Sequence, residues 1–541
     1  MKRLAIALIA AVALGGAAHA ADLPTRKAVE APAAKPNCWG SFWNWLNSSP
    51  DDCPIGAYGI SVYGTLDVGV GYQSWGTTFN PSADKLNYGI QKSGHGPQWL
   101  ATYNALSTSV IGIKMKEDLG PLGLGGWSLI GLLEAGVNPY SGMFLNPPRS
   151  LADNNLHAPD KYPYQTANFD SSRNGSWMNS QGYVGISNAT LGQLTFGRTN
   201  SLPFDSLSKY DPVSSVAFSL IGFSNSFAGF GDTVLVRPNT AFTYKLTIPN
   251  ILGAQNIRLY GQAQIGGYDW QNGSQGAYYG QIGGDWGNLS LDGIVGWAKD
   301  AVSLSGFGGS GAAYCNGMVG IKVNGVCYDS NSVLKGTLSN NFGVELLGSY
   351  KWDQFKFYGG YIYTRLSNPS DDYTFGFRTT YPEISVPYGA VTSNNYNFNK
   401  VLNAFWTGVR YSVPDEWMHG WGALDLAAGI YYQTQNNYNF TVSKSGFTVA
   451  AACTGSGAFI SSSKCAGSQD GISVFADWKP LKRVDIYAGV MLTNVYGGLA
   501  NSFLQTSTYY VPTAGGKVKT VSWSTAHTQN VDPSIGIRVR F

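Results

Sequence analysis

The sequence predicts an all-β protein, a transmembrane antiparallel β-barrel of about sixteen strands with short periplasmic turns and long extracellular loops. Apolar and polar residues alternate at period two along most of the chain, the pattern of strands with one apolar face. Charged residues make up 12%, about half the usual globular share of roughly 25%, whereas aromatic residues reach 14% and glycines number 69. A spanning helix needs about 20 consecutive apolar residues, and the nearest candidate, residues 213–231, is interrupted by Ser, Asn and Gly.

Residues 1–20 have the features of a secretory signal peptide. Residues 1–3 (MKR) are a short basic region, residues 4–17 are apolar, and residues 18–20 (AHA) are a small-x-small cleavage site. Cleavage would remove two of the 35 basic residues and none of the 32 acidic ones, so the formal charge would fall from +3 to +1. This balance gives no reason to expect a nucleic-acid partner.

Residues 21–57 are expected to form a periplasmic N-terminal extension ahead of the barrel. A Pro- and Ala-rich stretch comes first and is typical of a flexible linker. The following CWGSFWNWLNSSPDDC (38–53) places Trp39, Phe42, Trp43 and Leu46 at helical spacing. We expect a short helix, closed by a disulfide, at the membrane face or under the pore. A stapled knob without a role in transport is an equally open alternative.

The six cysteines form three pairs that are local in sequence. In an exported protein such pairs indicate disulfides rather than metal ligands, because none has CxxC spacing and no histidine of the mature chain adjoins them. The expected disulfides are Cys38–Cys53, Cys315–Cys327 and Cys453–Cys465. No metal site and no cofactor is expected.

Residues 58–541 are expected to form the barrel. The first strand, 58–73, places Val62, Leu66 and Val68 on one face and Asp67 on the other. The same alternation recurs at 108–117, 127–137, 242–246, 257–265, 289–297, 342–352, 355–363, 423–433, 473–478, 484–492 and 534–541. In a membrane the apolar face meets lipid, so the charged side chains should face a water-filled lumen. These are Asp67, Glu134, Lys245, Arg258, Arg410, Arg538 and Arg540.

Alternation alone would also suit a soluble sandwich, but three other features favour a membrane barrel. Short turns are expected at 120–125, 187–192, 353–354 and 479–483, and long loops near 74–107, 138–179, 200–235, 299–340, 366–400, 434–470 and 496–531. Compact soluble domains rarely contain several loops longer than about 12–15 residues. Tyr and Trp crowd the segment ends, as in the aromatic girdles of barrels. Residues 534–541 (SIGIRVRF) alternate up to Phe541, as a strand pairing with the first one to close a ring would.

Several motifs resemble the general porins of Gram-negative outer membranes, a family of trimeric sixteen-stranded barrels. VYGTLDVGVGY (62–72) resembles the first strand of that family, and VIGIKMKEDLGPLGLGGWSLIGLLEAG (110–136) resembles its "GFKGxEDLGxGL" hairpin. QGYVGISNATLGQLTFGRT (181–199) resembles the pair that leads into the constriction loop, and RPNTAFTY (237–244) the strand that leaves it. The terminal Phe541 matches the last residue of the family. The resemblance covers residues 59–541, carried by these short motifs.

This resemblance implies a third loop, about residues 200–232, folded into the lumen as a constriction. By position, loop acids (Asp205, Asp211, Asp232) would face basic residues of the wall (Lys114, Lys116, Arg198, Arg237). It also implies a homotrimer in the outer membrane of a Gram-negative bacterium, in contact with membrane lipid and lipopolysaccharide. Phe541 would be the signal read by the barrel-assembly machinery.

The loop departs from the family in its apolar middle. The family's "PEFGG"-like acidic segment is missing, and the loop reads SSVAFSLIGFSNSFAGFG (214–231). Its Phe218, Leu220, Phe223, Phe227 and Phe230 either pack against the wall or expose aromatic rings to the channel. A basic wall with few loop acids would favour anions, because charges act strongly at close range in a narrow pore.

The function predicted from these features is a porin, a water-filled channel for passive diffusion of small hydrophilic solutes and ions. One alternative is a channel specific for sugars or aromatic and organic acids, with lumenal aromatics as a slide (Tyr260, Tyr358, Tyr431, Phe475, Tyr487). Another is a structural or adhesive barrel. An enzyme is not expected, because the histidines (His95, His157, His419, His527) fall in loops or a turn and no GxSxG stands in a strand-turn-helix context.

Overall fold

The structure is a computed structural model that describes residues 38–74, 98–140, 142, 144–145, 180–214, 217–221, 229–231, 236–238, 240–265, 276–305, 314–315, 318–323, 326–329, 333–368, 398–438, 466–497, 506–512, 518–524 and 529–541. The expected signal peptide and linker, Asp232, and the Cys453–Cys465 pair lie outside the described residues. For Cys315 and Cys327 only the backbone is described, as part of two short strands.

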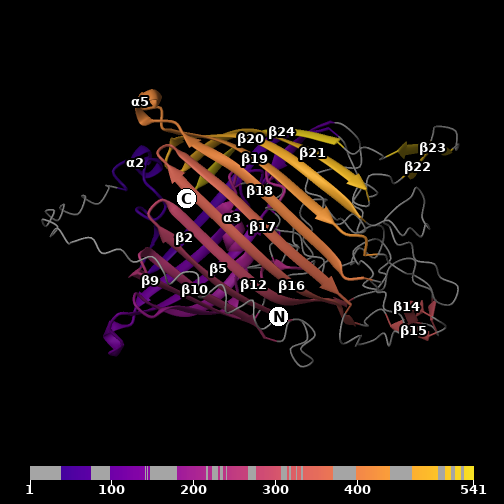
Figure 1. The fold of residues 1–541 in the computed structure, drawn as a ribbon, viewed down its shortest axis with the longest axis horizontal. Coiled ribbons are helices and arrows are strands. Elements are labelled where there is room, and N and C mark those ends of the chain that lie inside the picture. The colour runs from indigo at the N-terminus through magenta and orange to yellow at the C-terminus, as the bar shows by residue number, and fades with distance from the viewer. Residues whose placement is uncertain are drawn as a thin grey trace, which may run out of the picture. The chain divides into compact units, whose positions relative to one another are not determined.

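Sixteen antiparallel strands form a closed barrel, which confirms the predicted fold. Each strand pairs with the next along the chain, and the hairpins run side by side around the ring (Figure 1). The strands are β2 (Ile60–Gln73), β4 (Val110–Asp118), β5 (Trp127–Val137), β7 (Gln181–Asn188), β8 (Gly192–Arg198), β9 (Ala241–Ile251), β10 (Ala254–Gln264), β11 (Ala277–Trp286), β12 (Leu289–Ser305), β16 (Val333–Trp352), β17 (Phe355–Ser367), β18 (Lys400–Ser412), β19 (Ala423–Gln435), β20 (Gly467–Leu481), β21 (Val484–Gly497) and β24 (Gln529–Arg540).

The ring closes between the first and last of these strands. β2 pairs antiparallel with β24 from Thr65 opposite Arg540 to Gly71 opposite Ser534. Beyond this ladder, Gly64 N–H donates to Phe541 O at 3.0 Å, and Phe541 N–H donates back to Gly64 O at 2.9 Å. This pairing removes the open sheet edge that lipid would not tolerate.

The edge of β2 that does not pair with β24 is shared by two strands, β3 (Gln98–Tyr103) and β4. β3 pairs with the second half of β2, and β4 pairs with its first half. Residues 104–109 interrupt the wall between them. β3 lies inside the segment 74–107, which the sequence predicted to be an irregular loop, so that boundary was wrong.

Connections at one end are short, as predicted. They include the 3₁₀ turn η1 (Gly120–Leu122) and the helix α5 (Asp415–Met418) between β18 and β19. The connection between β16 and β17 bends at Asp353, whose φ is +54°.

Three further predictions about the long connections were wrong. Segment 299–340 is not irregular throughout, because β12 extends to Ser305, β16 begins at Val333, and β13 (Tyr314–Cys315), β14 (Met318–Val323) and β15 (Val326–Asp329) pair between them. Likewise β22 (Thr506–Pro512) and β23 (Val518–Ser524) pair within the predicted loop 496–531. In the predicted loop 138–179, β6 (Phe144–Leu145) pairs with β5. The connection 265–276 between β10 and β11 was not among the predicted loops.

The two faces of the wall differ as the alternation predicts. Leu346, Ile430 and Val474 point outward and are 56–57% exposed, whereas Glu345 and Ser473, their neighbours in sequence, are buried on the inner side. In the part of the chain that the structure describes, no helix has the length and apolar character needed to cross a membrane.

The N-terminal knob, residues 38–57, docks on the short-turn end of the barrel. It contains α2 (Phe42–Leu46), capped by Ser41 Oγ, which accepts from Asn44 N–H at 3.1 Å, and β1 (Ile55–Ala57), which pairs with the start of β2. The Cys38–Cys53 disulfide closes it, as predicted.

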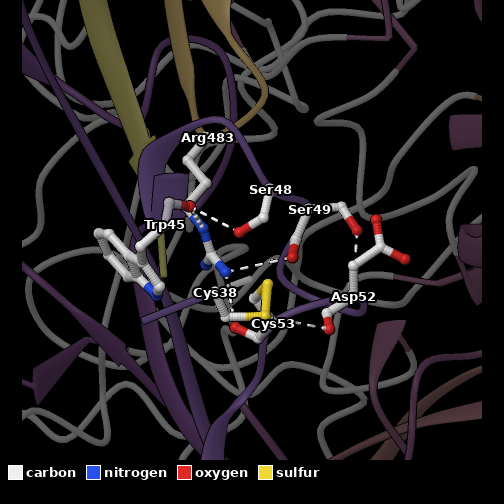
Figure 2. The surroundings of a disulfide bond; sticks show 7 residues. All are labelled: Cys38, Trp45, Ser48, Ser49, Asp52, Cys53 and Arg483. Carbon is white, nitrogen blue, oxygen red and sulfur yellow. Dashed lines mark hydrogen bonds between the residues drawn. A yellow bond between two sulfur atoms is a disulfide. The ribbon is translucent and has the colours of Figure 1, made fainter. Parts of the chain in front are cut away.

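Arg483 holds the knob to the turn between β20 and β21 (Figure 2). Its guanidinium is buried and donates to three knob carbonyls, those of Trp45 at 2.8 Å, Ser49 at 3.1 Å and Cys53 at 2.7 Å. The guanidinium also lies 4.3 Å from the centroid of the Trp45 ring. A second contact is the ion pair between Asp51 and Lys114 on β4, at 2.9 Å.

Candidate pore constriction

The loop between β8 and β9 folds back against the inner wall. It opens with the helix α3 (Leu202–Tyr210), for which Ser201 is the N-cap; Ser201 Oγ accepts from Phe204 N–H at 3.2 Å. Pro203 lies in the first helical turn, where its missing N–H costs nothing. The loop thus leaves the wall as a short, well-started helix rather than as irregular chain.

Charged contacts fix both ends of α3 to the wall. At its start Asp205 accepts from Lys245 on β9 at 2.7 Å. At its end Lys209 Nζ lies 3.2 Å from Asp292 on β12, and the Tyr210 hydroxyl donates to the same carboxylate at 2.6 Å. Asp292 is buried and also receives Arg258 Nε at 3.0 Å, so one carboxylate joins three basic or hydroxyl groups.

The chain that follows α3 is held by β18 and β19. Trp406 Nε1–H donates to Tyr210 O at 2.9 Å, and Arg410 donates to the carbonyls of Pro212 and Val213 at 2.9 and 3.0 Å. The Tyr431 hydroxyl donates to Asp211 Oδ1 at 2.7 Å. Burial raises the pKa of the Asp211 carboxyl, although hydrogen bonds from Ser219 and Tyr431 oppose that shift.

The apolar part of the loop packs against the inner wall. Phe218 is buried against Phe475, with the two ring centroids 5.5 Å apart. The Ser473 hydroxyl donates a hydrogen bond to the backbone carbonyl of Phe218. Phe230 lies over Gly296 and Gly343, where an added Cβ would be 2.7 and 2.1 Å from its ring. Glycines of the wall therefore form the seat for this ring. Phe223 and Phe227 lie outside the described residues.

The predicted basic residues of the wall fall in two places. Lys114 and Lys116 lie near the short-turn end of β4, where Lys114 pairs with the knob and Lys116 is exposed. Arg198 and Arg237 lie at the two ends of the loop, and both are buried. Arg198 donates to Ser180 O and to Arg237 O, each at 3.0 Å. Burial lowers the pKa of Arg237, whose guanidinium lies 5.1 Å from the Phe204 ring centroid.

Of the charged residues predicted to face the lumen, two acids form buried networks. Asp67 accepts hydrogen bonds from the backbone N–H groups of Leu106 and Ser107, both at 2.7 Å. It thereby provides acceptors for the backbone of the segment 104–109, which connects β3 and β4. Glu134 accepts from the Tyr63 hydroxyl at 2.8 Å.

The basic residues predicted to face the lumen contact either acidic side chains on the inner side of the wall or backbone carbonyls of the loop. Asp485 pairs with Arg538 at 2.9 Å and with Arg540 at 3.3 Å. Lys245, Arg258 and Arg410 make the contacts to the loop and its support already described.

The lumenal aromatics proposed as a solute slide are mostly covered. Tyr431, Phe475 and Tyr487 are 0–3% exposed because the loop and its neighbours lie over them, and Tyr358 is 6% exposed. Tyr487 also donates to Asp67 at 2.5 Å. These rings support the loop instead of offering an open aromatic surface, which argues against the slide.

Three basic residues occupy one row across neighbouring strands, and we call them the basic row: Lys351, Lys356 and Arg410. Lys351 of β16 is directly opposite Lys356 of β17, which is directly opposite Arg410 of β18. All three share the inner face with buried neighbours such as Ser349, Tyr358 and Trp406. The sequence places Lys351 and Lys356 on the polar face of their strands, but their alignment depends on the register between strands.

A model of the Gram-negative porins matches residues 7–493. The chain belongs to that family. This porin forms an outer-membrane channel for the passive diffusion of small hydrophilic solutes and ions. Among the described residues no His, Cys, Asp or Glu cluster could hold a metal ion.

Comparison with curated proteins finds no match. Solved structures similar to this porin include the anion-selective porin from Comamonas acidovorans, with 15% identity over 89% of this chain and 99% of that chain and a TM-score of 0.49. Another is OmpT, an outer membrane protein of Vibrio cholerae, with 12% identity over 90% and 99% of the two chains and a TM-score of 0.47. The outer membrane channel DcaP of Acinetobacter baumannii has 13% identity over 89% and 97%, with a TM-score of 0.42.

Proposed function

We propose that this porin is a passive channel that prefers anions, and that the basic row is the element that selects them. The observation that supports this proposal is the direct alignment of Lys351, Lys356 and Arg410 across three strands. Like charges directly opposite each other destabilise a sheet. Such an arrangement is therefore expected where a passing anion supplies the missing negative charge.

The surroundings of the row support the same proposal. The ion pairs formed among the described residues do not include Lys351 or Lys356. The Lys356 ammonium lies 4.9 Å from the centroid of the Tyr358 ring, and Arg410 is tied to loop carbonyls. Within the described part of the chain, the row thus combines two lysines that form no ion pair and one arginine that contacts the loop between β8 and β9. Rings of basic side chains are a common device of anion-selective pores.

Reversal potentials in a planar bilayer with a KCl gradient test this proposal. We expect the wild-type current to be carried mainly by chloride and the Lys351→Gln/Lys356→Gln variant to lose most of that preference. Lys482→Gln is the matched control, because Lys482 is an exposed lysine of a short turn outside the row. A wild-type channel that prefers potassium would contradict the proposal, as would equal selectivity in the double variant and the wild type.

We further propose that the porin is exported by cleavage after residue 20 and assembles as a homotrimer without enzymatic activity. The basic, apolar and AHA segments of residues 1–20 support export, and N-terminal sequencing of the purified protein tests the cleavage position. Lipopolysaccharide is the partner proposed for the long-loop end of the barrel. The barrel-assembly machinery is the partner proposed for Phe541. Three equal closing steps in single-channel records would support three pores per assembly, whereas single steps would argue for a monomer.

A further inference from the structure

A pocket lies on the outer side of the barrel beside α5. Its volume is about 450 Å³, and it is lined by Trp417, Met418, His419, Trp421, Leu424 and Trp478. Trp417 and Trp421 are 67% and 68% exposed, far more than large aromatic residues usually are. The turn that carries them is short and lies at the end of the barrel where the knob also docks (Figure 1).

The backbone around this pocket is fixed. His419, Gly420 and Gly422 have positive φ values of +48°, +83° and +86°, which turn the chain after α5 back toward the sheet. A Cβ at Gly422 would lie 2.1 Å from Lys479 O, so only glycine fits there. Trp478 Nε1–H donates to Trp421 O at 2.7 Å and ties the turn to β20. The hollow is therefore a built feature of the fold.

The floor of the pocket is continuous with the lipid-facing wall. Leu424 of β19 is directly opposite Trp478 of β20, and both lie on the face that carries the exposed Leu426 and Val474. A closed barrel of this family meets acyl chains on that face. The pocket extends the same apolar surface sideways at the short-turn end, where the headgroups of the inner leaflet begin.

We propose that this pocket binds a phospholipid of the inner leaflet that carries a primary ammonium headgroup, with an acyl chain among the tryptophans. The described charged side chains of α5 are Asp415 and Glu416, both exposed and acidic. They favour an ammonium group and repel an anionic headgroup. Exposed tryptophan faces also attract ammonium groups by cation–π interaction. The proposal depends on the outer-membrane family but not on the anion preference proposed above.

Native mass spectrometry of the detergent-solubilised porin tests this binding, with phosphatidylethanolamine and phosphatidylglycerol as the probes. We expect wild type to retain phosphatidylethanolamine, and Trp417→Ala/Trp421→Ala to bind it at least tenfold more weakly. Trp352→Ala is the matched control, because Trp352 is an equally exposed tryptophan at another short turn and does not line the pocket. Unchanged single-channel conductance of each variant shows that the barrel has folded.

The headgroup is tested separately by Asp415→Asn/Glu416→Gln. This variant should bind the two lipids equally, whereas wild type should prefer phosphatidylethanolamine. Equal retention by wild type and the tryptophan variant would overturn the proposal, and so would a wild type without headgroup preference. If the tryptophan variant instead loses its oligomeric state with lipid retention unchanged, the surface is a contact between copies and the lipid proposal is wrong.

Discussion

At the scale of single residues, much of this porin depends on side chains that satisfy backbone groups far away in sequence. Arg483 is the clearest case, because its guanidinium joins three carbonyls of a knob more than 400 residues earlier. The sequence around Arg483 does not indicate this contact, because an arginine in a turn is usually exposed to solvent. The cysteines and the aromatic spacing predicted the knob, but only the structure shows what holds it.

Replacing Arg483 by methionine should release the knob while leaving the barrel intact. One hydrogen bond to a charged group contributes about 1.5–3 kcal/mol. Because the guanidinium makes three such bonds, its loss should reduce the free energy of knob docking by at least the value of one of them. Hydrogen exchange of residues 42–53 measures the effect, and Lys482→Gln on the same turn is the control. Unchanged protection of the knob in Arg483→Met would show that other contacts hold it.

A second residue-scale prediction concerns the seat of Phe230. Gly343→Ala would place a methyl group 2.1 Å from the Phe230 ring, so the ring must move and the loop should dock about 1–3 kcal/mol less firmly. We expect a changed unitary conductance with more current noise. Gly261→Ala should behave as wild type, because no atom lies within 4 Å of its added Cβ. Identical records from both variants would mean that Phe230 does not position the loop.

At the scale of elements, the loop between β8 and β9 is held to the inner wall at several points along its length. Lys245, Trp406, Arg410 and Tyr431 each contact it from a different place on β9, β18 or β19. The loop is therefore part of the packed interior, and its docking should respond to the protonation of any buried group within it.

Asp211 makes that docking dependent on pH. Burial raises the pKa of this carboxyl above its ordinary value, while the Tyr431 and Ser219 hydroxyls and Arg410 oppose the shift. A raised pKa in the docked state means that docking is strongest at low pH and weakens as pH rises through that pKa.

Hydrogen exchange of residues 202–214 measured from about pH 4 to about pH 8, after correction for the intrinsic rates, should therefore show a falling protection. Asp211→Asn keeps an acceptor for Tyr431 but cannot ionise, so its corrected protection should not depend on pH. The same pH dependence in both proteins would assign it to another group.

Sequence and structure agree best on strands whose two faces differ strongly. The segment 342–352 was recognised because Val344, Leu346 and Tyr350 alternate with Glu345 and Lys351, and it lies within β16. β3 was missed because QWLATY (98–103) is short and pairs with only half of β2.

For the candidate site, the sequence could locate the loop but not its contacts. The basic row could not be predicted, since it depends on which residues of β16, β17 and β18 become partners. Register is a property of paired strands and is not visible in one segment alone.

At the scale of the whole molecule, the barrel depends on closure between β2 and β24. Phe541 exchanges two backbone hydrogen bonds with Gly64, and its ring covers that glycine, because an added Cβ there would lie 2.3 Å from Cζ. The side chain thus seals the outer face of the seam.

Phe541→Ala should lower the yield of assembled barrels more than it changes the conductance of those that form. The heat-resistant fraction of the protein measures the yield of assembled barrels, and planar-bilayer records measure their conductance. Val539→Ala, one apolar position earlier on the same face, is the control for general loss of apolar surface. A normal assembled yield in Phe541→Ala would refute this role.

We propose that this barrel is an open, water-filled channel narrowed by the docked loop 199–240. The measurement is the single-channel conductance of the purified protein in a planar bilayer, with wild type compared to a variant lacking residues 217–231. We expect a linear current–voltage relation that does not saturate with added solute, and a larger unitary conductance after the deletion. A protein that conducts no ions would rule out an open channel, and an unchanged unitary conductance after the deletion would show that the loop does not narrow it.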